Sequence, residues 1–85
     1  MKLKKKVAII TGGASGLGEA TARRYAKSGA NVIVADTNIS GGEKTAELIR
    51  MEGGTAEFVQ TDVTNESDVI NMMNVVKRKF AKLDV

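Results

Sequence analysis

Apolar residues follow two alternating patterns along this chain. Two short apolar runs, residues 6–11 and 31–36, are rich in Val, Ile and Ala, which is typical of strands buried on both faces. Residues 55–61 (TAEFVQT) are expected to form a third strand. Longer stretches whose apolar positions recur every three or four residues follow each run, at 16–28, 40–52 and from Asn65 to about Phe80. A fourth apolar run begins at Leu83. The pattern predicts strands and helices in strict alternation.

Residues that favour helix ends mark the expected boundaries. Gly29 follows the first helical stretch as a C′ residue. Ser40 is expected to cap the second helix, with Glu43 completing a capping box. Gly53 and Gly54 end that helix, and Asn65 opens the third.

Strands that alternate with helices imply a parallel sheet with right-handed crossovers. We therefore expect a doubly wound α/β fold with the strand order 3-2-1-4, in which the first strand is central once a fourth is present. The first two helices would cover one face of the sheet and the third helix the other. At 85 residues the chain is short for a complete domain of this kind.

The net charge of +3 comes from one cluster. Lys2, Lys4, Lys5 and Lys6 are four of the thirteen basic residues. The rest of the chain has nine basic and ten acidic residues, a net charge of −1. A solvated run before the first strand explains this better than a phosphate-binding arm, and we expect no nucleic acid partner. Four consecutive apolar residues from Val7 are too few for a signal peptide, and no run approaches a membrane span. We expect no membrane partner and a cytoplasmic location.

Composition narrows the chemistry further. The chain has no His and no Cys, which excludes a Ser-His-Asp triad, a cysteine nucleophile and thiolate metal sites. No metal site is expected.

A glycine-rich segment, TGGASGLG at residues 11–18, lies between the first strand and the first helix. Glycine permits positive φ in a tight turn, and the missing Cβ lets a phosphate reach backbone N–H groups. The N-terminus of the helix adds the positive end of its dipole. A P-loop would need Lys where Glu19 stands, and the spacing is not GxGxxG. A glycine-rich strand-to-helix turn without a ligand is the structural alternative.

The spacing TGxxxGxG resembles the cofactor loop of the short-chain dehydrogenases/reductases, and TGGASGLGEATA is close to that family's usual wording. The resemblance implies a Rossmann-like fold and a dinucleotide on this loop. It implies cofactor-binding roles for Gly12, Ser15, Gly16, Leu17 and Gly18.

Asp36 ends the second strand, eighteen residues after Gly18. An acid at about this distance can accept hydrogen bonds from the adenosine ribose hydroxyls. Its charge would repel the 2′-phosphate of NADP, and Ser15 and Thr37 offer no compensating cation. NAD is therefore favoured over NADP. The alternative is that Asp36 only caps the turn that follows it.

Asp62 and Val63 end the third strand and resemble the family's adenine-contacting Asp-Val pair. In the family the carboxylate meets the adenine amino group and the next N–H meets a ring nitrogen. Without the resemblance, Asp62 is as readily explained as a turn residue.

The residues that would perform the chemistry are absent from this chain. The family uses a Ser, a Tyr and a Lys four residues after the Tyr, whereas the only Tyr here is Tyr25, with Gly29 four residues on. We expect Tyr25 to be a packing residue and the 85-residue chain alone to be inactive. Residues 1–85 are thus expected to form the N-terminal dinucleotide-binding part of a single domain. The alternative is a non-catalytic module that binds a nucleotide or pairs with a partner, including a second copy, through the edge of the first strand.

Overall fold

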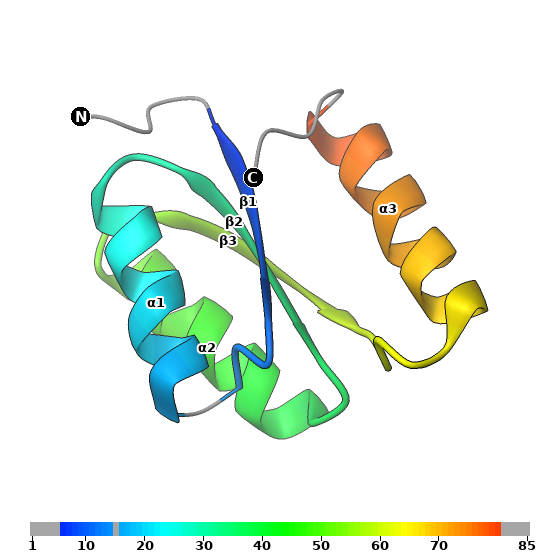
Figure 1. The fold of residues 1–85 in the computed structure, drawn as a ribbon. Helices are drawn as coiled ribbons and strands as arrows, with labels where there is room; N and C mark the ends of the chain where they lie inside the picture. Colours follow the sequence, from blue (N-terminus) through cyan, green and yellow to red (C-terminus); the bar gives the residue numbers. More distant parts are fainter. Residues whose placement is uncertain (1–5, 15, 81–85) are drawn as a thin grey trace.

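The computed structural model describes residues 6–14 and 16–80. Within them three strands and three helices alternate: β1 (Val7–Thr11), α1 (Gly16–Lys27), β2 (Asn31–Asp36), α2 (Ile39–Met51), β3 (Thr55–Gln60) and α3 (Glu66–Phe80). The strands form one parallel sheet in the order β1-β2-β3 (Figure 1). The predicted α/β fold is confirmed, and no element boundary differs from the expected one by more than one residue. The run that begins at Leu83 lies outside the described residues.

The sheet has a helical layer on each face, as expected: α1 and α2 on one side and α3 on the other (Figure 1). Successive strand side chains point to opposite faces, so each strand supplies both layers. The α1/α2 side buries a cluster formed by Ala8, Ile10, Ala22, Ala30, Val32, Val34, Ala46, Ile49 and Ala56. The α3 side buries Val7, Ile33, Met72 and Val76. Small residues dominate the first cluster because two helices pack closely on three strands there.

Both early helices end at a glycine with positive φ. Gly29 has φ 98° and Gly53 has φ 89°. After α1, the N–H of Ala30 donates to the Tyr25 carbonyl at 3.1 Å, and the N–H of Gly54 donates to the Ile49 carbonyl at 2.9 Å after α2. These are the long hydrogen bonds of Schellman motifs, which satisfy helix carbonyls and turn the chain into the next strand.

The start of α2 corrects the sequence analysis. Asn38 is the N-cap, with its side-chain oxygen accepting from the Gly41 N–H at 2.9 Å, while Ser40 lies inside the helix. Asp36 causes the earlier start, because its Oδ1 accepts from the Asn38 N–H at 2.9 Å and closes a tight turn directly after β2. The capping box with Glu43 is therefore not formed.

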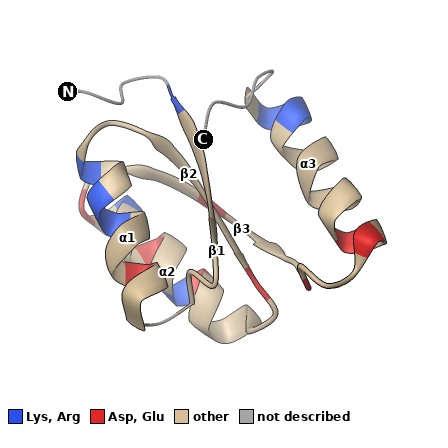
Figure 2. Ribbon diagram, viewed as in Figure 1, with Lys and Arg blue, Asp and Glu red and all other residues tan. Residues whose placement is uncertain are grey.

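Charged residues are distributed unevenly along the helices (Figure 2). Basic residues occupy the last turns, with Arg24 and Lys27 on α1 and Lys77 to Lys79 on α3. Glu66 and Asp68 lie in the first turn of α3. Each arrangement complements the helix dipole, and together they place the basic residues of these last turns at the amino edge of the sheet.

Candidate functional site

The carboxyl edge of the sheet brings together three segments that are far apart in the sequence. Because the strands are parallel, the ends of β1, β2 and β3 meet at this edge (Figure 1). The Gly12 N–H donates to the Ala35 carbonyl at 2.9 Å, and the Thr61 N–H donates to the Asp36 carbonyl at 3.0 Å. These bonds extend the pairing with β2 by one residue past the end of β1 and of β3. The glycine loop, Asp36 and Asp62 thus share one side of the molecule.

Two glycines of the loop have backbone conformations that side chains disfavour. Gly12 has φ 68° and Gly16 has φ 59°, and an added Cβ at either position would point into open space. These positions require glycine for backbone conformation and leave the space above the loop clear.

Gly13 and Gly18 serve a different need, which is close packing. A Cβ on Gly13 would lie 2.8 Å from Cγ1 of Val34. A Cβ on Gly18 would overlap the Gly12 carbonyl oxygen and lie 2.6 Å from the Gly12 carbonyl carbon. Gly18 therefore lets the first turn of α1 rest directly on the loop backbone.

The N-terminus of α1 faces the resulting open surface. The first N–H groups of a helix have no partner within the helix, and here they belong to Gly16, Leu17 and Gly18. The Leu17 side chain is 84% exposed. A hollow of about 330 Å³ lies beside it, lined by Ile9, Ile10, Thr11, Gly12, Leu17, Gly18 and Thr21. Ser15 lies outside the described residues.

Asp36 links β2 to the glycine loop. Its Oδ1 accepts from the Asn38 N–H at 2.9 Å and its Oδ2 accepts from the Ala14 N–H at 3.1 Å. The Asn38 N–H is the largest cause that holds the Asp36 pKa below its ordinary value, and the Ala14 N–H acts in the same direction. Asp36 thus caps a turn, as the alternative interpretation proposed. Carboxylate oxygens have lone pairs for additional donors, so this role is compatible with ribose binding.

The turn after β3 is equally well ordered by hydrogen bonds. Asp62 Oδ1 accepts from the Thr64 hydroxyl at 2.6 Å and from the Thr64 N–H at 2.9 Å, and both bonds lower the Asp62 pKa. The Asp62 N–H donates to Asp68 Oδ2 at 3.0 Å. The side chain of Val63 is 56% exposed. These hydrogen bonds fix the turn that carries the Asp62 carboxylate and Val63 at the carboxyl edge of the sheet.

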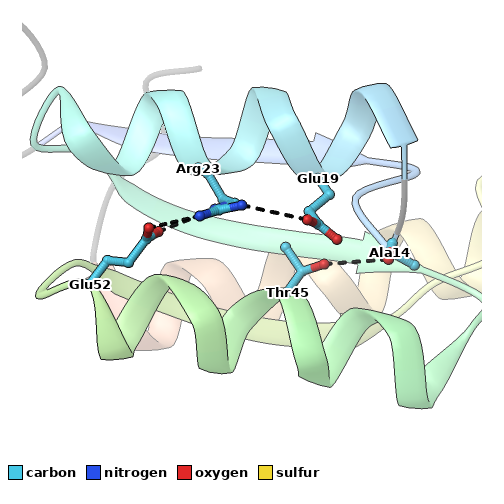
Figure 3. Close-up of polar contacts among 5 residues, drawn as sticks. All are labelled: Ala14, Glu19, Arg23, Thr45 and Glu52. Carbon is cyan, nitrogen blue, oxygen red and sulfur yellow. Dashed lines mark hydrogen bonds and ion pairs between the residues drawn. The ribbon is translucent and has the colours of Figure 1, made fainter.

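Two residues that support the site, Thr45 and Asp68, could not be predicted from the sequence. Thr45 of α2 is fully buried and its hydroxyl donates to the Ala14 carbonyl at 3.4 Å (Figure 3). Asp68 of α3 holds the Asp62 N–H. Neither belongs to a motif, and their roles depend on which elements pack together.

The opposite edge contains a second hollow of about 190 Å³, between the ends of α1 and α2. Arg23 and Glu52 are among its lining residues. They form a two-pronged ion pair, with Nη2 2.8 Å from Oε2 and Nε 3.2 Å from Oε1, and Glu19 lies 3.8 Å from the same guanidinium (Figure 3). Arg23 and Glu52 thus join the two helices, and Glu19 directly follows the glycine-rich segment.

Other features bear on the chemistry that the described residues can hold. Tyr25 is half-buried on α1 and packs against the α1/α2 core, as expected for a packing residue. Within residues 6–14 and 16–80, no three His, Cys, Asp or Glu side chains gather as a metal site. Over the same residues, no helix has the length and apolar character to cross a membrane.

The glycine loop and the two carboxylates fit a dinucleotide. The space above Gly12 and Gly16 is open where side chains would intrude, helix N–H groups border it, and acceptors stand at the ends of β2 and β3.

Comparison with known proteins agrees with this geometry. The family model for short chain dehydrogenases matches residues 6–85. The chain is 47% identical over 83 residues to 3-hydroxyacyl-CoA dehydrogenase type-2 of Drosophila melanogaster, covering 98% of this chain and 31% of that protein. It is 48% identical over 85 residues to momilactone A synthase of Oryza sativa subsp. japonica, covering 99% of this chain and 30% of that protein. The chain therefore spans about a third of the length of these relatives.

Solved structures give the same result. A hydroxysteroid dehydrogenase from Escherichia coli superposes with a TM-score of 0.95 at 32% identity, over 98% of this chain and 35% of that one. A D-mannonate oxidoreductase from Haemophilus influenza, described as putative and with bound NAD, superposes with a TM-score of 0.93 at 29% identity. The match covers 98% of this chain and 30% of that structure.

Proposed function

The chain belongs to the short-chain dehydrogenase family, and from that premise we propose that residues 1–85 hold the adenosine half of NAD. The protein that contains them would transfer a hydride between the nicotinamide ring and an alcohol or ketone substrate. The cofactor supplies the hydride chemistry, and this segment supplies binding and orientation. Residues 1–85 would then be the N-terminal, dinucleotide-binding part of a single Rossmann-type domain.

The observation that carries the proposal is the geometry of the glycine loop. Gly12 and Gly16 leave open space where side chains would block a phosphate, and the N-terminus of α1 begins at that space. Backbone N–H groups there can donate to the pyrophosphate, and hydrogen bonds to a charged group are worth about 1.5–3 kcal/mol each. We assign Ser15, Gly16, Leu17 and Gly18 to this role. Gly12, whose own N–H donates to the Ala35 carbonyl, would bind the cofactor by leaving room for it.

We assign Asp36 to the ribose, and Asp62 and Val63 to the adenine. The hydrogen bonds from Asn38 and Ala14 lower the Asp36 pKa, so the carboxylate is charged at neutral pH. A 2′-phosphate about 4 Å away would be repelled by roughly 1–4 kcal/mol per unit charge. This supports NAD over NADP, and the similar structure from Haemophilus influenza holds NAD.

The catalytic groups would lie in a part of the protein beyond this segment. The chain spans about a third of the length of the relatives it matches, and its only Tyr, Tyr25, packs against the core. We therefore propose that the 85-residue chain alone binds cofactor without catalysing hydride transfer. A cytoplasmic location remains a prediction from the sequence.

The test is a calorimetric titration of the protein that contains this chain with NAD and with NADP. We expect NAD to bind about 5- to 1000-fold more tightly, as the repulsion above implies. Asp36→Asn should reduce the difference between the affinities for NAD and NADP. Glu66→Gln, which removes one exposed charge from the first turn of α3, should leave it unchanged. Tighter binding of NADP by the wild-type protein would contradict the assignment of Asp36.

A second candidate is a non-catalytic module that pairs with another strand, including that of a second copy. The observation in its favour is that β1 stands at the edge of the described sheet. Light scattering during size-exclusion chromatography distinguishes the two. A dimer of the chain that persists with NAD absent, together with no binding of either cofactor, would favour the pairing module.

A further inference from the structure

Both backbone polar groups of Ala14 are bound by residues distant in the sequence. Its N–H donates to Asp36 Oδ2 at 3.1 Å, and its carbonyl accepts from the Thr45 hydroxyl at 3.4 Å. The partners lie 22 and 31 positions along the chain and belong to different elements, the end of β2 and the middle of α2. Ala14 is itself 8% exposed. The loop is therefore anchored at one residue between two elements.

Thr45 differs from a typical helical threonine. Such a hydroxyl usually bonds a carbonyl of its own helix one turn earlier, or points to water. The side chain of Thr45 is 0% exposed, and its hydroxyl instead crosses from α2 to the glycine loop (Figure 3). A valine would fill the same space and suit a buried position better. The hydroxyl has a specific partner, which valine would leave unbound.

A second contact brings α2 against the same residue. A Cβ added to Gly41, one turn before Thr45, would lie 3.1 Å from Cβ of Ala14. The face of α2 that bears Gly41 and Thr45 therefore rests on residue 14. This helix is separated from the loop by α1 and β2 in the sequence, so tertiary packing makes the contact.

We propose that Thr45 is a positioning residue for the glycine loop, whose hydroxyl holds the Ala14 carbonyl and thereby fixes the N–H groups of residues 16–18 toward a dinucleotide pyrophosphate. The inference rests on the proposed function for its ligand. Those N–H groups follow Ala14 by two to four residues, so a shift of the Ala14 carbonyl moves them. Asp36 anchors the same residue but would also bind ribose hydroxyls. Thr45 supplies an anchor that the ligand does not share.

The test compares Thr45→Val, which keeps the shape and removes the hydroxyl, with Thr45→Ser, which keeps the hydroxyl. The readouts are the calorimetric Kd for NAD and hydrogen–deuterium exchange of the peptides that cover residues 12–18. Thr45→Val should weaken NAD binding about 2- to 10-fold, the range that one lost hydrogen bond implies, and should speed exchange in the loop. Thr45→Ser should keep both values near those of the wild type.

Thr61→Val is a matched control for exchange. Thr61, which directly follows β3, is also buried, and its hydroxyl donates to the carbonyl of Val59 in that strand. This variant should not alter exchange at residues 12–18. If Thr45→Val does not fold, Thr45→Ser and Thr45→Ala replace the pair, since they differ only by the hydroxyl.

Three results would separate the explanations. A lower Tm of Thr45→Val with unchanged NAD affinity and unchanged loop exchange would overturn the proposal, as would equal impairment by Val and Ser. If the wild-type protein binds neither NAD nor NADP, the proposed function fails. The exchange comparison then still decides whether Thr45 holds the loop.

Discussion

Replacing Gly18 by Ala tests how α1 is seated on the glycine loop. In an exposed helix this change stabilises by about 1 kcal/mol, because glycine loses more conformational freedom on folding. At position 18 the new Cβ would overlap the Gly12 carbonyl oxygen and lie 3.0 Å from Cα of Gly13. All three nearest atoms belong to the backbone of the loop, so no side-chain rotation can relieve the overlap.

The helix-propensity gain and the steric overlap oppose each other, and together they set the expected loss of stability. Inserting a carbon into a packed region costs typically 1–3 kcal/mol and occasionally more, even where side chains can adjust. Gly18 offers no such adjustment, and α1 must move as a unit. We expect Gly18→Ala to lower the free energy of unfolding by about 2 kcal/mol, a large part of the 5–15 kcal/mol typical of a domain. The displaced helix N-terminus should also weaken NAD binding.

Gly42→Ala is the matched control, since it is the same change inside another helix. Its new Cβ would overlap the ring of Phe58, with Cζ at 2.9 Å. Phe58 is half-buried and the obstacle is a side chain, so Phe58→Leu should restore part of the stability lost in Gly42→Ala. Urea unfolding followed by circular dichroism measures all of these variants. A Gly18→Ala protein with a urea midpoint equal to or above that of the wild type would refute the reasoning.

Three further predictions concern charged groups. The hydrogen bonds that lower the Asp36 pKa stabilise the fold above the ordinary carboxyl pKa of about 4. This stability should be lost as the pH falls through the lower pKa of the folded state. In urea unfolding at a series of acidic pH values, the midpoint of Asp36→Asn should therefore fall less steeply with decreasing pH than that of the wild type. A double-mutant cycle of Arg23→Met and Glu52→Gln should give a favourable coupling that shrinks as salt is added, because the pair is exposed, and a salt-independent coupling would argue against direct ion pairing. Asp68→Ala should weaken binding of 5′-AMP more than Asp68→Asn, whose amide oxygen can still accept from the Asp62 N–H; equal affinities by calorimetry would show that this contact does not support the adenine site.

The order and type of all six described elements could be predicted from the sequence, because apolar periodicity records burial directly. The strand at 31–36 was predicted to the residue. The start of α2 was predicted wrongly, since Asp36 and Asn38 form a local turn that competes with the Ser40 cap. Glu57 has no charged residue within four positions along the chain, yet the fold places its carboxylate 3.4 Å from the Lys79 ammonium on α3.

Some residues of the candidate site could be predicted from the sequence and others could not. The glycine loop and Asp36 carry local signatures, because a tight turn and a strand end each restrict which residues fit. Thr45 and Asp68 carry none, since their partners are backbone groups brought near by helix packing. The family's motifs include the groups that would touch a ligand. The groups that hold those contacts in place become visible only in the folded chain.

Paired residues lie the same number of positions apart in both strand pairs, which bears on how the chain folds during synthesis. Val7 pairs with Asn31 and Asn31 pairs with Thr55, and 31 − 7 and 55 − 31 are both 24. Each strand therefore docks on the strand made just before it, after one helix of crossover. A ribosome adds about 5–20 residues per second, whereas helices form within about a microsecond. We expect each strand–helix unit to join the growing sheet in the order of translation.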